Sequence, residues 1–438
     1  MLLVAALIVL AVILGFPRLQ SFAAVGCSYK AKALASALFV SGLDTDPERA
    51  PEIADEAYRL MRLFRTRVDR EKKTVTVSFF GLQPKTAAYR PGLGATLTPG
   101  PLPPPPAWTT PEPAAELPRA EAAAIAPILD AALTEPNPRR LRRTRAVVVL
   151  RDGAILGERY APGITATTPL NGWSMTKSVM GALIGTLVAE GKLRLGDKHL
   201  LAEWNGAGDP RGDISLEDLL RMSSGLRFSE VYSDTFSDVT RMIFDSYDAA
   251  GYAAARPLES APGTAWKYTS GTSNILSLIA RRAVGEKNYL SWPRRALFEP
   301  LGMASAVFEP DAAGTFVGSS FLFATARDWA RFGLLYAEGG RRLLPDGWVR
   351  FATTPAPSAP ERKYGAHWWL KLSKELGGET PSAAKIPADA FHALGHEGQC
   401  LTVIPSRRLV VVRLGLSIDI KAWDHAAFLA DLLHALPA

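Results

Sequence analysis

A serine and a lysine three residues apart, Ser174 and Lys177, begin a long segment with a helical apolar pattern. Residues at i and i+3 lie on one face of a helix, about 5–6 Å apart at Cβ, so the amine can reach the hydroxyl. A serine hydroxyl becomes a good nucleophile when a base takes its proton, and burial lets a lysine be that base because it lowers the pKa. The helical pattern ends at Gly191 and consists of Met180, Leu183, Ile184, Leu187 and Val188. The sequence therefore predicts a helix that presents a serine nucleophile with a lysine base.

The same spacing occurs a second time, at Ser382 and Lys385. Glycine and proline interrupt helices, and they surround this copy at Gly377, Gly378, Pro381 and Pro387. No helix of useful length can begin there. We interpret the second copy as a coincidence of spacing.

Composition narrows the classes of function. The chain has 438 residues, enough for more than one average domain, and its two cysteines exclude a disulfide framework and a cysteine-based zinc site. Five arginines between residues 139 and 145 precede an apolar run, but no aromatic-rich basic motif accompanies them. We therefore expect no nucleic-acid partner. The chain has no His-Glu-x-x-His pair, and His392 and His396 lie in strand-like surroundings, so neither a metal site nor a cofactor is expected.

The first 16 residues are almost wholly apolar and end at Pro17 and Arg18. This length is just below the ~17–25 residues that span a bilayer, so a signal peptide and a short anchor both remain open. Ser21 to Ala23 would suit signal cleavage, whereas the lack of Lys or Arg before the apolar run favours an uncleaved transmembrane helix. Residues 1–23 are predicted to be an anchor or signal, with the membrane as a partner. The protein is expected to be membrane-anchored or exported to the cell envelope.

A proline-rich run divides the rest of the chain. Residues 99–120 include four consecutive prolines and predict an extended linker. Residues 24–98 before it form an accessory segment with helices expected at 31–40 and 53–64 and a strand at 74–80. Residues 121–438 after it form the main domain.

Strand patterns lie at both ends of the main domain, with helical patterns between them. Asp152 and Gly153 separate apolar runs at 146–150 and 154–160, which indicates a hairpin. Helical patterns fill about 195–370, strands return at 400–404 and 409–416, and a last helix covers 423–436. We therefore predict an α/β (α+β) fold in which helices flank one antiparallel sheet, with a helical subdomain inserted.

Two more positions have side chains suited to the same chemistry. Tyr268 lies in a loop just before a helical pattern, where a tyrosine can relay a proton. His396 lies between Gly395 and Gly398, and glycine near a strand lets a ligand or another backbone approach closely. Taken alone, each residue is also compatible with a purely structural role.

In order along the chain, these motifs resemble the serine β-lactamase and penicillin-binding fold. They resemble most the β-lactamase-related hydrolases, a group that includes 6-aminohexanoate-dimer hydrolases and family VIII esterases. The resemblance covers roughly residues 145–436, and its most specific stretches are 172–178, 222–226, 324–333 and 395–399.

The resemblance implies a role for each motif residue. Ser174 would be the acylated nucleophile, Lys177 its base and Tyr268 the second proton carrier. The backbone N–H groups of Ser174 and Gln399 would form the oxyanion hole. His396, Gly398 and Tyr232 would contact substrate, although Tyr232 can equally be a surface tyrosine.

Two motifs depart from the pattern of penicillin-binding relatives. Their Tyr-x-Asn appears as Tyr268-Thr269-Ser270, and their Lys-Thr-Gly as His396-Glu397-Gly398. Without the lysine, no fixed charge would hold a substrate carboxylate. The departures therefore favour a serine hydrolase that forms an acyl-enzyme with a small neutral ester or linear amide.

Three other functions are compatible with parts of this pattern. A Ser-His-Asp hydrolase would need a nucleophile elbow, and the segment around Ser174 lacks the second glycine of that motif. A non-catalytic penicillin-binding-like receptor and a D-stereospecific peptidase remain open as alternatives.

Overall fold

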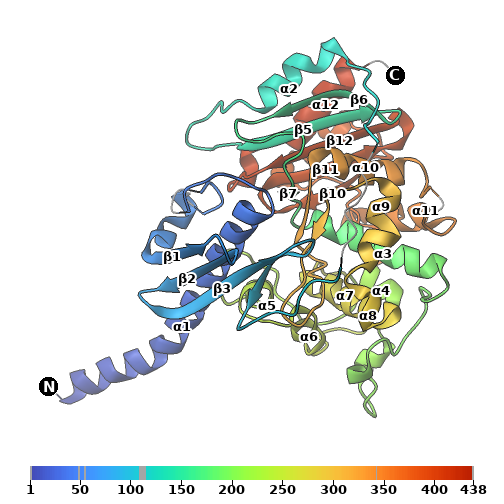
Figure 1. Ribbon diagram of the computed structural model, residues 1–438. Helices are drawn as coiled ribbons and strands as arrows, with labels where there is room; N and C mark the ends of the chain where they lie inside the picture. Colours follow the sequence, from blue (N-terminus) through green and yellow to red (C-terminus); the bar gives the residue numbers. More distant parts are fainter. Residues whose placement is uncertain (1, 48–49, 54–55, 108–114, 342, 437–438) are drawn as a thin grey trace.

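Five antiparallel strands form the central sheet, in the order β10-β11-β12-β5-β6. The computed structural model describes residues 2–47, 50–53, 56–107, 115–341 and 343–436. β12 pairs with β5, with Val411 opposite Val149, so the two ends of the main domain meet in one sheet (Figure 1). This confirms the predicted sheet assembled from distant segments. In sequence order the strands are β5 (Thr144–Arg151), β6 (Ala154–Tyr160), β10 (Phe391–Gly395), β11 (Gln399–Ile404) and β12 (Leu409–Gly415).

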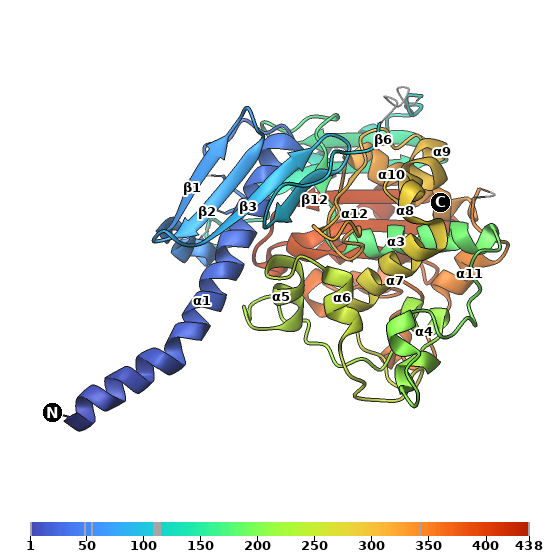
Figure 2. The ribbon, with the colours of Figure 1, turned by 60° about the horizontal axis from the view of Figure 1, so that its bottom comes forward.

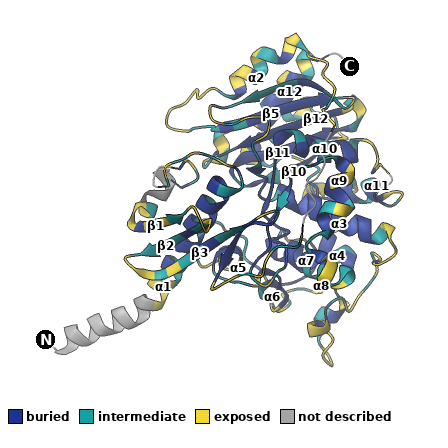
Figure 3. Cartoon of the chain, viewed as in Figure 1, coloured by how far each residue is buried: buried dark blue, intermediate teal, exposed yellow. Residues whose placement is uncertain are grey.

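Helices cover both faces of this sheet, so its inner strands are apolar on both sides and largely buried (Figure 3). One face packs on α10 (Ala326–Ala337). The other packs on α2 (Ala126–Ala132) and α12 (His425–Ala435). A Cβ on Gly333 of α10 would lie 2.5 Å from Val410 Cγ1, so a glycine is required for this helix to approach β12.

The inserted subdomain is helical, as the sequence predicts, and its longest helices are α3 (Met175–Ala189) and α7 (Ser270–Val284), which pack together. A small antiparallel sheet in the order β7-β9-β8 lies beside them. The remaining helices and strands here are β7 (Leu170–Asn171), α4 (Leu216–Leu220), α5 (Asp238–Phe244), α6 (Ala249–Ala254), α8 (Glu286–Tyr289), α9 (Glu299–Leu301), β8 (Val307–Phe308), β9 (Leu322–Ala324) and α11 (Trp348–Thr353). Short 3₁₀ segments include Ala202–Trp204, Pro210–Asp213, Ala383–Lys385 and His396–Gly398.

A separate lobe precedes the main domain. It consists of α1 (Leu2–Phe39) and a four-stranded antiparallel sheet in the order β1-β2-β3-β4 (Figures 1 and 2). The expected helix at 31–40 lies in α1, and the expected strand at 74–80 is β2. At the expected second helix the structure has a 3₁₀ helix, Glu56–Leu63, and residues 54–55 lie outside the described part. The strands are β1 (Phe64–Asp69), β2 (Thr74–Phe79), β3 (Leu82–Arg90) and β4 (Gly94–Thr98).

The predicted transmembrane helix is wrong. Among the residues that the structure describes, no helix is long and apolar enough to cross a membrane. The predicted boundary at residue 23 falls inside α1, and from Ala23 onward this helix packs on its own sheet and is part of the protein core. The apolar residues of α1 that are buried there include Val25, Ala31, Leu34, Ala35 and Leu38.

A buried ion pair fastens the N-terminal lobe to the main domain. Lys32 of α1 donates to Glu309, in the segment after β8, and both side chains are nearly inaccessible to solvent. Glu309 also accepts hydrogen bonds from Ser36 Oγ at 3.2 Å and from the backbone N–H of Ala95 in β4 at 2.7 Å. One carboxylate thus joins the helix and the sheet of the lobe to the main domain.

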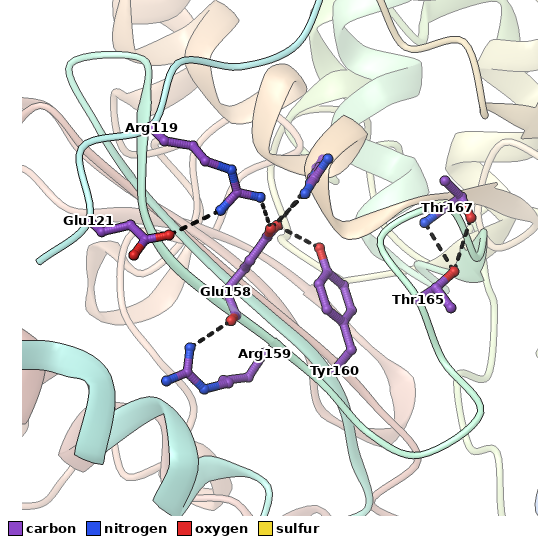
Figure 4. A network of polar contacts seen from close by, with 8 residues as sticks. Arg119, Glu121, Glu158, Arg159, Tyr160, Thr165 and Thr167 are labelled. Atoms are coloured by element: carbon purple, nitrogen blue, oxygen red, sulfur yellow. Dashed lines mark hydrogen bonds and ion pairs between the residues drawn. The ribbon is translucent and has the colours of Figure 1, made fainter. Parts of the chain in front are cut away.

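A second polar cluster ties the end of the linker to the main sheet. Glu158 of β6 accepts from Arg119 Nη2 at 2.5 Å and from the hydroxyl of Tyr160 at 2.8 Å (Figure 4). Arg327 at the start of α10 binds the same carboxylate through two nitrogens, at 2.6 and 2.8 Å. Burial alone would raise the pKa of the Glu158 carboxyl, but the hydrogen bonds from Arg327, Tyr160 and Arg119 outweigh it and hold the pKa at about 2.

Glu158→Gln is expected to remove part of the acid dependence of stability. A carboxyl whose pKa is lowered in the folded state stabilises that state above the unfolded pKa of about 4.3, and this stabilisation is lost as the pH falls toward 2. After allowance for solvent screening, the contribution at neutral pH is about 1–2 kcal/mol. Urea unfolding at pH 7 and pH 3 checks this contribution. The difference in the free energy of unfolding between wild type and variant should be smaller at pH 3 than at pH 7. An equal difference at both pH values would contradict the assignment.

Candidate active site

The candidate nucleophile lies at the turn between β7 and α3. Ser174 directly precedes the first residue of α3, and the Ser174 side chain caps no backbone N–H of the helix. Trp173 before it has a φ of +48°, a left-handed conformation that bulky residues rarely adopt and that typically marks a functional constraint. A Cβ on Gly172 would lie 2.2 Å from Trp329, so only glycine fits there. Close packing of the turn on α10 thus fixes the position of Ser174.

Lys177 lies one turn into α3 and is 1% exposed. Its Nζ donates to Ser174 Oγ at 2.8 Å, to Ser270 Oγ at 3.0 Å and to the carbonyl oxygen of Ser319 at 3.1 Å. Burial lowers the pKa of Lys177 to about 8, and the charge of Glu230 opposes this shift. A neutral amine is therefore accessible near physiological pH, as a general base requires.

The second Ser-x-x-Lys copy has none of this environment. Ser382 is half-buried, Lys385 is exposed, and only a single 3₁₀ turn follows Ser382. This arrangement agrees with its interpretation as a coincidence.

Glu230 is a candidate site residue that the sequence analysis missed. Its carboxylate accepts from Ser270 Oγ at 2.5 Å and from the Ser270 backbone N–H at 2.8 Å. Burial raises the pKa of Glu230, while Lys177 lowers it. The three side chains form a hydrogen-bonded chain from Lys177 through Ser270 to Glu230. The sequence signal for Glu230 is weak, because a single acidic residue in a loop belongs to no periodic pattern. Its partner Ser270, however, was visible as the altered third residue of the Tyr-x-Asn motif.

Both tyrosines named from the sequence lie near Ser174, the candidate nucleophile. The Tyr268 hydroxyl interacts with the Ser174 side chain, and Lys177 Nζ lies 4.9 Å from the centre of the Tyr268 ring. The Tyr232 hydroxyl also interacts with Ser174, and it lies 3.5 Å from Ser270 Oγ. Burial raises the pKa of both phenols above the usual value, so both are neutral donors at pH 7.

His396 lies beside these groups but carries no charge. Its ring stacks on Tyr232, with centroids 5.0 Å apart and planes 15° apart, and lies 5.2 Å from the Trp173 ring. Burial lowers the pKa of His396 to about 4, so the imidazole is neutral at pH 7.

The two other predicted residues of this turn have their contacts elsewhere. A Cβ on Gly398, whose φ is +79°, would lie 2.6 Å from Arg413 Nη1. The Gln399 side chain donates to the carbonyl oxygen of Gly415 at 2.6 Å and accepts from the Gly415 N–H at 2.9 Å. Both residues shape the β10–β11 turn against β12. The role of the Gln399 backbone N–H stays a prediction.

Comparisons with known proteins agree with this geometry. A family model described as Beta-lactamase matches residues 129–415. The 6-aminohexanoate-dimer hydrolase of Paenarthrobacter ureafaciens is 28% identical over 326 residues, which cover 67% of this chain and 79% of that protein. Its name denotes hydrolysis of a dimer.

Solved structures show the same fold. A Bacillus anthracis protein provisionally assigned as a 6-aminohexanoate-dimer hydrolase superposes with a TM-score of 0.58 at 21% identity, over 75% of this chain and 91% of that one. An octameric penicillin-binding protein homologue from Pyrococcus abyssi gives a TM-score of 0.51 at 20% identity, over 67% of this chain and 74% of that one. At these identities the likeness establishes the fold, and the family match extends over well over half of the chain. The chain therefore belongs to the β-lactamase family and is a hydrolase of that fold.

Proposed function

We propose that this protein is a serine hydrolase that forms an acyl-enzyme at Ser174 and acts on a small ester or linear amide. The observation that carries the proposal is the 2.8 Å hydrogen bond between Lys177 Nζ and Ser174 Oγ, made by an amine whose pKa burial lowers to about 8. A base in contact with the hydroxyl that it must deprotonate is the arrangement that nucleophilic catalysis requires.

The reaction proceeds in two halves. Neutral Lys177 takes the hydroxyl proton as Ser174 Oγ attacks the substrate carbonyl, and a tetrahedral oxyanion forms. Collapse of this intermediate breaks the ester or amide bond, and the leaving group receives a proton from Lys177, relayed by the Tyr268 or Tyr232 hydroxyl. Water then attacks the acyl-enzyme with Lys177 again as the base, which releases the acid and restores Ser174.

Backbone donors at the nucleophile turn would stabilise the oxyanion. The Ser174 N–H makes no hydrogen bond to any residue in the described part of the chain, so it is free to donate. The β10–β11 turn would supply a second donor, and it lies close to the nucleophile turn, since a Cβ on Gly395 would lie 2.3 Å from the carbonyl oxygen of Gly172. The resemblance assigns that donor to Gln399. Removal of one such donor typically costs about 10²–10³ in rate.

The substrate acyl group is proposed to be neutral. His396 stands where penicillin-binding relatives have lysine, and burial keeps its imidazole uncharged. Short neutral p-nitrophenyl esters and short ω-amino acid amides should therefore be hydrolysed faster at pH 7 than a chromogenic cephalosporin, whose carboxylate needs a cationic partner. The similarity to a 6-aminohexanoate-dimer hydrolase makes linear amides the natural second class to assay.

His396→Lys should narrow the preference for neutral substrates, because it supplies the missing positive charge. The readout is the ratio of kcat/KM for the ester to kcat/KM for the cephalosporin. A wild-type enzyme that hydrolyses the cephalosporin as fast as simple esters would contradict the role given to His396.

The rate is expected to rise with pH. Lys177 must be neutral to accept a proton, so kcat/KM should increase through the pKa of about 8 and level off above it. The Glu230 charge raises the pKa of Lys177, so Glu230→Gln should move the midpoint of the profile to lower pH. A pH–rate profile of both proteins tests this. A midpoint that stays in place or moves to higher pH would contradict the electrostatic link between Glu230 and Lys177.

A further inference from the structure

A cavity lies between the N-terminal lobe and the main domain, outside the catalytic cluster. About 70 Å³ of it is open to the centre of a water molecule. Its apolar walls include Tyr29 of α1 and Phe244 and Phe321 of the main domain, and its polar lining includes Glu52, Arg145 and Glu397. Since one water needs about 10–15 Å³ by this measure, the space suits a ligand of roughly five non-hydrogen atoms.

Trp173 forms the wall between this cavity and the nucleophile. Its indole Nε1 donates to Glu397 Oε2 at 3.1 Å on the cavity side. Its ring also contacts His396 and Tyr232, with centroids 5.2 and 6.5 Å away. Ser174, Lys177 and Tyr268 do not line the cavity. The space therefore lies outside the cluster of Ser174, Lys177 and Tyr268, although two residues of the candidate site, Trp173 and Gln399, line it.

Two carboxylate oxygens in the cavity lack a donor among the described residues. Glu52 pairs with Arg145 through Oε1, but its buried Oε2 has no hydrogen-bond partner. Glu397 accepts from Trp173 through Oε2, and no described residue donates to its Oε1, which is not fully buried. Buried polar atoms are normally hydrogen-bonded, and a buried acceptor without a donor is costly. The buried Glu52 oxygen, together with the unmatched Glu397 oxygen, therefore indicates a ligand that brings hydrogen-bond donors.

The charges around the cavity favour a cation over an anion. The two basic side chains in the lining already have carboxylate partners, Glu309 for Lys32 and Glu52 for Arg145. Glu397 has no cationic partner in direct contact within the described chain. An ammonium group has three donors and no acceptor, which matches the two unmatched oxygens.

We propose that this cavity is a second ligand site, which binds a short aliphatic primary ammonium ion with its head group at Glu397 and Glu52 and its alkyl chain against Tyr29, Phe244 and Phe321. The bound ion contacts the same glutamate that holds Trp173. A ligand in this site therefore contacts the hydrogen-bond partner of Trp173, the residue that precedes Ser174.

Binding should strengthen with pH. Burial raises the pKa of Glu397 to about 7, and the charged groups that face it are Arg145 and Arg143, which lower the pKa, and Glu52, which raises it. Only the ionised carboxylate attracts an ammonium ion. The affinity should therefore increase from pH 6 to pH 8, about tenfold per unit well below the pKa and little above it.

Calorimetric titration of the full chain with n-butylammonium chloride tests the proposal, with n-butanol as a neutral probe of nearly the same shape. At pH 8 we expect butylammonium to bind at least tenfold more tightly than butanol, and Glu397→Gln to remove at least tenfold of that affinity. Ser174→Ala should bind butylammonium as wild type does, so the outcome does not depend on the proposed hydrolysis.

Three results would overturn the proposal. They are equal affinities of wild type for butylammonium and butanol, an unchanged affinity in Glu397→Gln, and loss of binding in Ser174→Ala. The comparison of the two probes uses the wild-type protein, so it decides the question even if Glu397→Gln does not fold.

Discussion

Ser174→Ala is expected to lower kcat/KM for a p-nitrophenyl ester by at least about 10³-fold, because it removes the atom that attacks the carbonyl. The fold should persist. Ser174 is half-buried, and its hydroxyl caps no backbone group of α3, so its loss should change the free energy of unfolding by less than about 1 kcal/mol. Steady-state kinetics and denaturant unfolding of the same preparation separate the two effects.

The chain supplies a matched control in its second Ser-x-x-Lys sequence. Ser382→Ala makes the same chemical change at a half-buried serine beside an exposed lysine, and it should leave kcat/KM within about twofold of wild type. Equal losses in the two variants would show that neither serine is the nucleophile.

Lys32→Ala is expected to destabilise the protein by about 3–5 kcal/mol, the usual cost of leaving a buried charge without its partner. Glu309 would keep its hydrogen bonds from Ser36 and Ala95 but would lose its only cationic partner among the described residues. The N-terminal lobe should then loosen from the main domain. Thermal and denaturant unfolding of the full chain measure the change.

Two further variants make this result specific. Lys72→Ala changes an exposed lysine of the same lobe and should alter stability by no more than about 0.5 kcal/mol. The double variant Lys32→Met with Glu309→Leu removes both charges and should recover much of the loss, because apolar replacements of similar size often substitute for a buried pair. If Lys32→Ala were as stable as Lys72→Ala, the ion pair would not be what holds the lobe.

The sequence was sufficient to predict the main sheet and helix α3 because both depend on local patterns. The apolar runs of β5 and β12 are long enough to identify as strands, and helices on both faces explain why neither alternates. Ser174 and Lys177 are three residues apart, so helix geometry alone brings them together.

Long-range contacts explain what the sequence could not predict. Glu230 reaches Ser270 across 40 positions of chain, and Lys32 reaches Glu309 across 277. No periodicity links such pairs. The predicted boundary at residue 23 was wrong for the same reason: α1 continues to Phe39, and only the fold shows that Val25 and Leu34 are buried in protein.

Intact-protein mass spectrometry after a rapid acid quench tests the acyl-enzyme most directly. Wild-type protein mixed with excess p-nitrophenyl acetate should gain the mass of one acetyl group, peptide mapping should place that group on Ser174, and the adduct should disappear as substrate is exhausted. Acetylation at any other residue would contradict the account. So would turnover during which neither the wild type nor the Lys177→Ala variant carries an adduct.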